Sequence, residues 1–269
     1  MKKQKTVLLV AIGLFISLQV NAGWVITQRN YDSDEGVESA IAETVYLQNN
    51  IMKVVQANMI TMFDLNKETM TIMSSANKVY WTGNVGSYKV EIKATMKTAM
   101  DEQLAKASPE QKEMIQKMYH GMMESIDNPS KFAGEEPEEY DLKIEKTGEK
   151  ERVAGKLAVK YTIKVNGSLK EEAWLSESDR ANTEFDINKF YSVFTDFISQ
   201  AGTVSFYQAD EKYMEFSKKG FPLKSITYNG GYESISEVIN LDKQKLSKEE
   251  FDIPAGYKKV NLAEIGLNE

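Results

Sequence analysis

The spacing of hydrophobic residues changes twice along this chain, and that change limits the fold to a class with both sheets and helices. From Trp24 to Trp81 the sequence is rich in Thr, Val, Ile and Tyr, with turn residues between short apolar stretches. Asn49-Asn50 and residues 64–67 are predicted hairpin turns, because asparagine tolerates a positive φ and polar residues favour turns. The first part of the chain is therefore predicted to be an antiparallel meander.

Two helices are predicted after these strands. The first has an apolar residue at every fourth position, which is the spacing of one helical face: Tyr88, Ile92, Met96, Met100 and Leu104. Ser108, Pro109 and Gln111 then form a second helix start, with serine as N-cap, proline in the first position and glutamine in the third. The second apolar face consists of Met114, Met118, Met122 and Ile126, and Asn128-Pro129 is predicted to end the helix.

Strands resume after an acidic loop at residues 130–139. Apolar and polar residues alternate over 140–145 and 157–165, which is typical of strands with one buried face, and Asn166-Gly167 is a strong hairpin signal. Residues 187–201 are apolar around most of a helical circumference. Such a helix is enclosed by the fold or faces something other than water.

These elements predict one α+β domain over residues 23–269, because no stretch resembles a flexible linker. A last hairpin at Asn229-Gly230-Gly231 adds two more strands. An antiparallel sheet of this many strands should curl. We therefore predict a curled antiparallel sheet, or half-open barrel, with helices covering its concave face.

The N-terminus has the order of a secretory signal. Three lysines precede an apolar run from Val7 to Val20, which Asn21 and Ala22 follow. The run is 14 residues long, shorter than the ~20 residues of a membrane-spanning helix. We expect residues 1–22 to be cleaved after Ala22, leaving no transmembrane segment. The predicted location is the periplasm of a Gram-negative bacterium, with secretion from the cell as the alternative.

Composition excludes several classes of function. The chain has no cysteine and one histidine, so thiolate chemistry, disulfides and multi-histidine metal cages are excluded. Loss of the three signal-segment lysines leaves 30 of 33 basic side chains against 40 acidic ones, a formal charge of −10. This charge disfavours nucleic acid as a partner. No phosphate-binding loop, dinucleotide fingerprint or nucleophile elbow is present, so we predict no cofactor and no enzymatic activity.

Methionine is concentrated in one part of the sequence. Eleven methionines lie between residues 52 and 123. Methionine adapts to partners of irregular shape, so this cluster either fills gaps in a core or lines a deformable cavity. The residues predicted to line a cavity share helical spacing on segments expected to face the sheet: Met96, Met100, Met118, Met122, Phe190, Phe194 and Phe197.

Metal sites have weaker support in the sequence. His120 lies among methionines, which suggests a Cu(I) site, but it points nearly opposite to residues 118 and 122 on a helix. Asp32, Asp34 and Glu43 match three positions of a calcium loop, but Gly36 is one place early. We therefore interpret these residues as ordinary surface and turn residues, and predict no metal.

Several turn motifs resemble those of a known family. They are a strand turn at Phe63-Asp64-Leu65, a Gly-x-Pro-Leu step at 220–223 and a closing Phe-x-Ile-Pro-x-Gly-Tyr at 251–257. The chain resembles an exported bacterial family of unassigned function that looks related to the periplasmic lipoprotein carriers LolA, LolB and RseB. The resemblance spans most of the mature chain and implies a half-barrel with a hydrophobic cavity. It implies no catalytic residue.

Two functions follow as expectations. The first is a periplasmic protein that binds a hydrophobic ligand, either a lipid or an acylated envelope protein, in an apolar cavity between sheet and helices. The second is an envelope interaction module that contacts a protein and holds no small molecule. A hydrolase would need two carboxylates facing each other in a cleft, a separation that sequence does not give.

Overall fold

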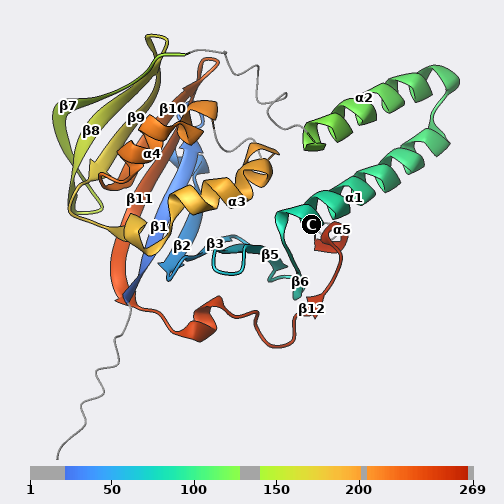
Figure 1. Ribbon diagram of the computed structural model, residues 1–269, viewed down its shortest axis with the longest axis horizontal. Helices are drawn as coiled ribbons and strands as arrows, with labels where there is room; N and C mark the ends of the chain where they lie inside the picture. Colours follow the sequence, from blue (N-terminus) through green and yellow to red (C-terminus); the bar gives the residue numbers. More distant parts are fainter. Residues whose placement is uncertain (1–21, 128–139, 201–204, 266–269) are drawn as a thin grey trace, which may run out of the picture.

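A computed structural model describes residues 22–127, 140–200 and 205–265. The predicted signal segment, except Ala22, and the predicted acidic loop at 130–139 lie outside these residues. The described part forms one sheet, with three longer helices and two short ones beside it (Figure 1). The helices are α1 (Val85–Lys106), α2 (Pro109–Asp127), α3 (Ile187–Gln200), α4 (Glu211–Ser217) and α5 (Leu262–Ile265).

The strands form a 12-stranded sheet in the order β12-β6-β5-β4-β3-β2-β1-β11-β10-β9-β8-β7. Neighbouring strands pair antiparallel except β12 and β6, which are parallel. The edge strands β12 and β7 are not neighbours in this order, so the sheet is open. The predicted α+β class with a curled, mostly antiparallel sheet is confirmed. The strands are β1 (Ala22–Asp32), β2 (Ile41–Gln48), β3 (Ile51–Gln56), β4 (Met59–Asp64), β5 (Thr69–Ser74), β6 (Val79–Gly83), β7 (Leu142–Val153), β8 (Lys156–Val165), β9 (Ser168–Ser176), β10 (Phe221–Asn229), β11 (Tyr232–Lys245) and β12 (Lys258–Lys259).

The predicted hairpin turns lie where strands connect. Asn49 and Asn50 have φ of 51° and 62° between β2 and β3, and Asn166 has φ of 50° between β8 and β9. These are left-handed conformations that asparagine adopts more readily than most residues. The turn between β7 and β8 uses Ala154, with φ of 48°, and Gly155 instead. An alanine there gives no comparable sequence signal.

The helix-covered face of the sheet carries two hydrophobic cores. The larger core joins Trp24 and Ile26 of β1 and Phe63 of β4 to the aromatic side of α3. The smaller core packs α4 and the turn before it against β8 and β9, with Tyr161 and Phe216 in edge contact at 5.1 Å between ring centroids. The cross-strand pairs link β1 through β11 and β10 to β9, with register shifts at Thr27/Gln28 and at Pro222/Lys224, and α3 and α4 lie over the same face of these strands (Figure 1).

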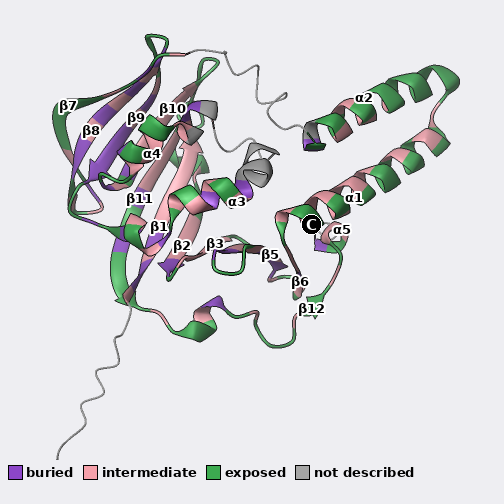
Figure 2. Ribbon diagram, viewed as in Figure 1, coloured by how far each residue is buried: buried purple, intermediate pink, exposed green. Residues whose placement is uncertain are grey.

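The two helices that carry the predicted methionines, α1 and α2, do not lie over the sheet as α3 and α4 do. α1 and α2 form an antiparallel hairpin that projects beyond the sheet (Figure 1). The base of α1 is fixed by Tyr88, which packs on Trp81, and by Glu91, which accepts a 2.8 Å hydrogen bond from the Leu262 amide. Farther out, the helices contact each other rather than the sheet, and their residues are mostly exposed or half-buried (Figure 2).

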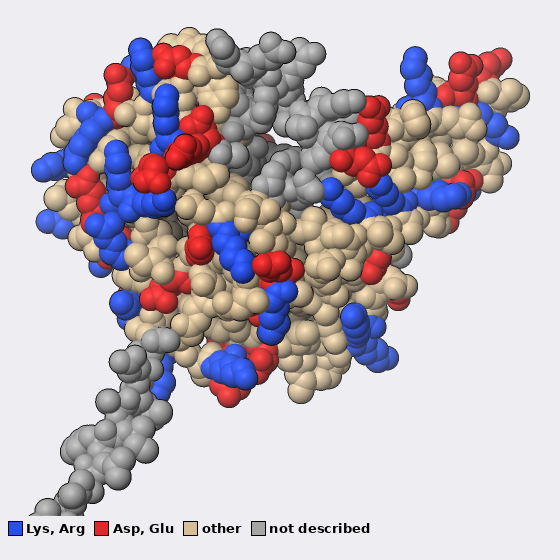
Figure 3. All heavy atoms as spheres, viewed as in Figure 1, with Lys and Arg blue, Asp and Glu red and all other residues tan. Residues whose placement is uncertain are grey.

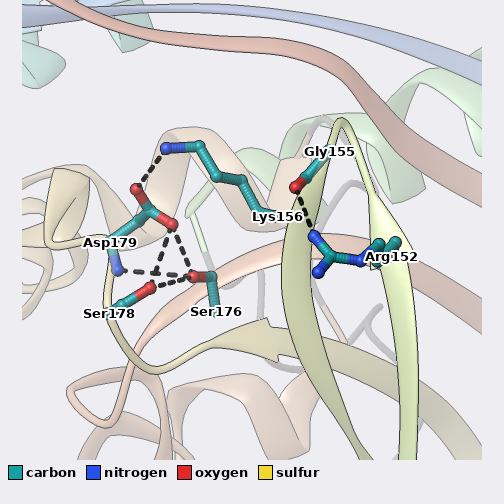
Figure 4. A network of polar contacts seen from close by, with 6 residues as sticks. All are labelled: Arg152, Gly155, Lys156, Ser176, Ser178 and Asp179. Carbon is teal, nitrogen blue, oxygen red and sulfur yellow. Dashed lines mark hydrogen bonds and ion pairs between the residues drawn. The ribbon is translucent and has the colours of Figure 1, made fainter.

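A polar network fixes the end of β9 (Figure 4). The Ser176 hydroxyl donates to Asp179 at 2.6 Å, and the Lys156 ammonium donates to the same carboxylate at 3.1 Å. Burial alone would raise the pKa of Asp179, but the hydrogen bonds from Ser176 and Lys156 outweigh burial and the pKa is lowered. The network holds the β9 backbone at the place where Gly220 approaches it.

We expect Gly220→Ala to destabilise the fold by about 1–3 kcal/mol, because overpacking strains a fixed backbone. A Cβ atom at residue 220 would lie 2.4 Å from the Ser176 carbonyl oxygen. Gly121→Ala is the control, because a Cβ there meets nothing within 4 Å. Urea unfolding measures both variants. The control should lose no stability, because Gly121 lies inside α2, where alanine is the better helix former, and a Gly220→Ala variant that also loses none would show that the close approach is unimportant.

Candidate functional site

An apolar groove lies between α1 and α2, and we call it the methionine groove. It has a volume of about 130 Å³. Four of the residues predicted to line a ligand cavity meet here: Met96 and Met100 from α1, and Met118 and Met122 from α2. The lining is completed by Ala99, Gln103, Ile115 and Tyr119. The structure therefore brings these four methionines together, against each other rather than against the sheet.

The sequence explains locally why this hairpin forms. Asn84 caps α1 by accepting a 2.8 Å hydrogen bond from the Ser87 amide. At the corner, Ser108 and Gln111 form the predicted capping box, with the Ser108 amide donating to the Gln111 side chain at 2.9 Å. Lys93 of α1 and Asp127 of α2 form an ion pair near the open end of the hairpin. Caps and ion pair together fix the two apolar faces toward each other.

The methionine groove is open to water. Met118 is 56% exposed and Met122 is 40% exposed, while Met114, one turn before Met118, is 66% exposed. On the face that Figure 3 shows, side chains between the two helices are mainly uncharged, with lysines along one border. Clustered exposed apolar side chains with a polar rim are typical of interaction sites.

The predicted phenylalanines lie elsewhere. Phe190 is 8% exposed and Phe194 has no exposed surface. Both pack edge-on against Phe63, with ring centroids 5.1 Å apart in each pair. The side chain of Phe197 lies outside the described residues. Phe190 and Phe194 are thus core residues between α3 and the sheet, separate from the methionine groove.

A buried carboxylate was not predicted as a feature of interest. Glu171 of β9 is 4% exposed, and the single hydroxyl proton of Tyr213 on α4 is donated to this carboxylate, with the hydroxyl 3.1 Å from each of the two oxygens. Tyr207 and Gln208 also donate to it, at 3.4 and 3.5 Å. Burial raises the pKa of Glu171 to about 6, and the three hydrogen bonds partly oppose this. The Glu171 charge and burial in turn raise the pKa of Tyr213 and of Tyr191 on α3, with burial the larger cause.

The residues considered for metals lie at the surface or form hydrogen bonds with other side chains. His120 is exposed on α2. Asp32 accepts a 2.6 Å hydrogen bond from Ser234, and Glu43 accepts one from Gln28. Within the described ranges, no group of three or more His, Asp or Glu side chains is arranged to hold a metal ion. In the same ranges, no helix is both long enough and apolar enough to cross a bilayer.

Comparison with solved structures gives weak similarities. PNGF-II has 9% identity and a TM-score of 0.35, covering 91% of this chain and 32% of its own. The MucB chain of the Pseudomonas aeruginosa MucA/MucB complex has 12% identity and a TM-score of 0.36, with coverage of 88% and 56%. A second complex of MucB with MucA(peri) has 11% identity and a TM-score of 0.37, with coverage of 90% and 57%. The chain thus spans about a third of PNGF-II and somewhat over half of MucB.

The search of curated proteins found no match. A family model does match the sequence. The model described as Domain of unknown function (DUF4412) covers residues 67–257, which include α1, α2, the buried Glu171 and most of the sheet. The chain belongs to this family.

Proposed function

We propose that this protein is an exported binding protein of the bacterial envelope, and that its methionine groove holds the apolar face of an amphipathic helix from a partner polypeptide. The observation that carries this proposal is the juxtaposition of Met96, Met100, Met118 and Met122 in one open groove. An amphipathic helix presents apolar side chains at intervals of three and four residues, which suits a groove between two helices.

The size of the groove favours side chains over a whole small molecule. Pockets that enclose small ligands usually measure about 300–1,000 Å³. The methionine groove measures about 130 Å³, so it accommodates a few apolar side chains. The space between α3 and the sheet is occupied by Phe63, Phe190 and Phe194. This packing supports a function in binding a protein partner better than a function in enclosing a lipid.

Methionine suits this role because its unbranched side chain can repack around partners of different shape. Covering one half-exposed methionine contributes roughly 1 kcal/mol, about half of the 1.5–3 kcal/mol for a fully buried apolar side chain. Several such contacts at once are needed for useful affinity. The proposal involves binding without catalysis and needs no cofactor.

Export is proposed from the sequence of residues 1–22, with the periplasm as the expected compartment and secretion as the alternative. The resemblance to the periplasmic lipoprotein carriers, which rests on the turn motifs, stays a prediction. Cell fractionation with N-terminal sequencing of the mature protein tests export. Recovery of an uncleaved chain in the cytoplasm would contradict it.

We expect Met118→Glu to weaken binding of a fluorescent amphipathic helical peptide with a Leu/Met-rich face by about tenfold or more, because a buried charge replaces an apolar anchor. Fluorescence anisotropy measures the affinity. His120→Glu is the matched control, since it adds the same charge on the opposite side of α2. Equal affinities in both variants would contradict the proposal, as would uptake of a palmitate probe without peptide binding.

A further inference from the structure

On β1, β11 and β10, the helix-covered face of the sheet becomes hydrophilic toward one end. Along β1, the residues on this face are Trp24 and Ile26, followed by Gln28, Asn30 and Asp32. On β11, the same face passes from Leu241 and Val238 to Ser236 and Ser234. An inner face built only for packing would keep its apolar residues over the whole strand.

The polar residues form two rows across neighbouring strands. Asn30 of β1 pairs with Ser236 of β11, which pairs with Ser225 of β10. In the next row, Asp32 pairs with Ser234, Ser234 with Thr227, and Thr227 with the buried Glu171 of β9. Neighbouring strands lie about 4.8 Å apart, so each row presents closely spaced polar groups.

A pocket of about 330 Å³ lies over these rows. Its lining includes Asn30, Asp32, Ser225, Thr227, Ser234 and Ser236. The loop after β1 forms another side of the pocket, with Glu35 and Ser39. This loop is held in place by hydrogen bonds from the Gly36 amide to the Asp32 carbonyl at 3.0 Å and from the Ser39 hydroxyl to the Gly36 carbonyl at 2.8 Å.

Several polar side chains of the lining remain available for a ligand, whereas the Ser234 hydroxyl donates to Asp32 and the Ser39 hydroxyl donates to the Gly36 carbonyl. Among the described residues, none forms a side-chain hydrogen bond with the hydroxyl of Ser225, Thr227 or Ser236, or with the Asn30 amide group. Hydroxyl and amide groups both donate and accept hydrogen bonds, whereas carboxylates only accept. The described lining contains no lysine or arginine, which disfavours a phosphate or another anion.

We infer that this pocket binds a neutral polyhydroxylated ligand, a saccharide of one or two rings. Sugar hydroxyls also donate and accept, so they match rows of serine, threonine and asparagine, and they donate to Asp32 and Glu35. An ammonium ligand only donates and would leave the hydroxyl protons of the rows unused. The pocket volume falls in the range of small-ligand sites. It shares no lining residue with the methionine groove, so this binding is additional to the proposed function.

Titration of the full mature chain with glucose, galactose, N-acetylglucosamine, maltose and cellobiose tests the inference, with spermidine as a cationic probe. Saturation-transfer NMR and calorimetry should detect binding of at least one sugar. The double variant Thr227→Val with Ser236→Ala should weaken it about tenfold, because two hydrogen bonds are lost. Thr98→Val on α1 makes the same chemical change outside the pocket and should leave affinity unchanged.

Circular dichroism shows whether each variant is folded, and Ser236→Ala alone serves as the milder substitution if the double variant unfolds. Reduced sugar affinity in a folded pocket variant, with normal affinity in Thr98→Val, supports the inference. Absence of sugar binding by the unmodified chain would overturn it. Binding of spermidine alone, or sugar binding that the pocket variants leave unchanged, would overturn it as well.

Discussion

Replacing Phe194 by alanine should lower the free energy of unfolding by about 3–5 kcal/mol, the range for removing a large aromatic side chain from a packed core. Phe194 has no exposed surface and packs edge-on against Phe63 at 5.1 Å between ring centroids. The alanine variant would leave a cavity and remove this aromatic contact. Urea unfolding followed by circular dichroism measures the loss.

Met118→Ala is the informative comparison. Phe194 and Met118 were both predicted to line a ligand cavity, but Phe194 is buried whereas Met118 is 56% exposed in the methionine groove. Its truncation should change stability by no more than about 0.5 kcal/mol while weakening peptide binding. If Phe194→Ala keeps its full stability and instead loses a co-purified apolar molecule, the region beneath α3 is a ligand site and the proposal that it is core is wrong.

The helices themselves were predictable because their signals are local. The capping box at Ser108 and Gln111 and the four-residue apolar spacing depend on neighbours in the sequence. What covers an apolar face depends on the tertiary arrangement. The same spacing serves Tyr88, which packs on Trp81, and Met100, which lies opposite α2 in the groove. Sequence spacing alone therefore could not separate core from groove.

Glu171 shows the same limit for a polar residue. The chain has 40 acidic side chains, so a single glutamate in a strand does not by itself indicate a functional or buried residue. The available signal was its position in the alternation of the strand, because Glu171 lies on the same strand face as the buried Ala173 and Leu175. A charged residue on an inward-facing position of an alternating strand is a reason to expect a shifted pKa. Its partners Tyr207 and Tyr213 come from a segment some 40 residues later, and their positions required the structure.

Replacing Glu171 by glutamine should make the protein more stable at about pH 8, by up to about 2 kcal/mol. The folded state raises the pKa of Glu171 from 4.5 to about 6, mainly through burial, so the folded protein binds this proton more tightly than the unfolded chain. The resulting stabilisation is complete below about pH 4.5 and is lost as the pH rises through about 6. Glutamine stays neutral, so the variant should not lose this stability.

The glutamine side chain can retain the hydrogen bonds, because the Tyr213 hydroxyl, 3.1 Å from both Glu171 oxygens, can donate to one position and accept from the other. The difference in unfolding free energy between the variant and the unmodified chain should therefore be near zero at about pH 4 and largest at about pH 8. Glu113→Gln, on the exposed surface of α2, should give a small difference that does not follow this pH course. A Glu171→Gln variant whose loss of stability grows as the pH rises from about 4 to about 8 would show that the ionised carboxylate holds Tyr207 and Tyr213 in place more strongly than its burial opposes folding, and that the segment around α4 depends on this charge.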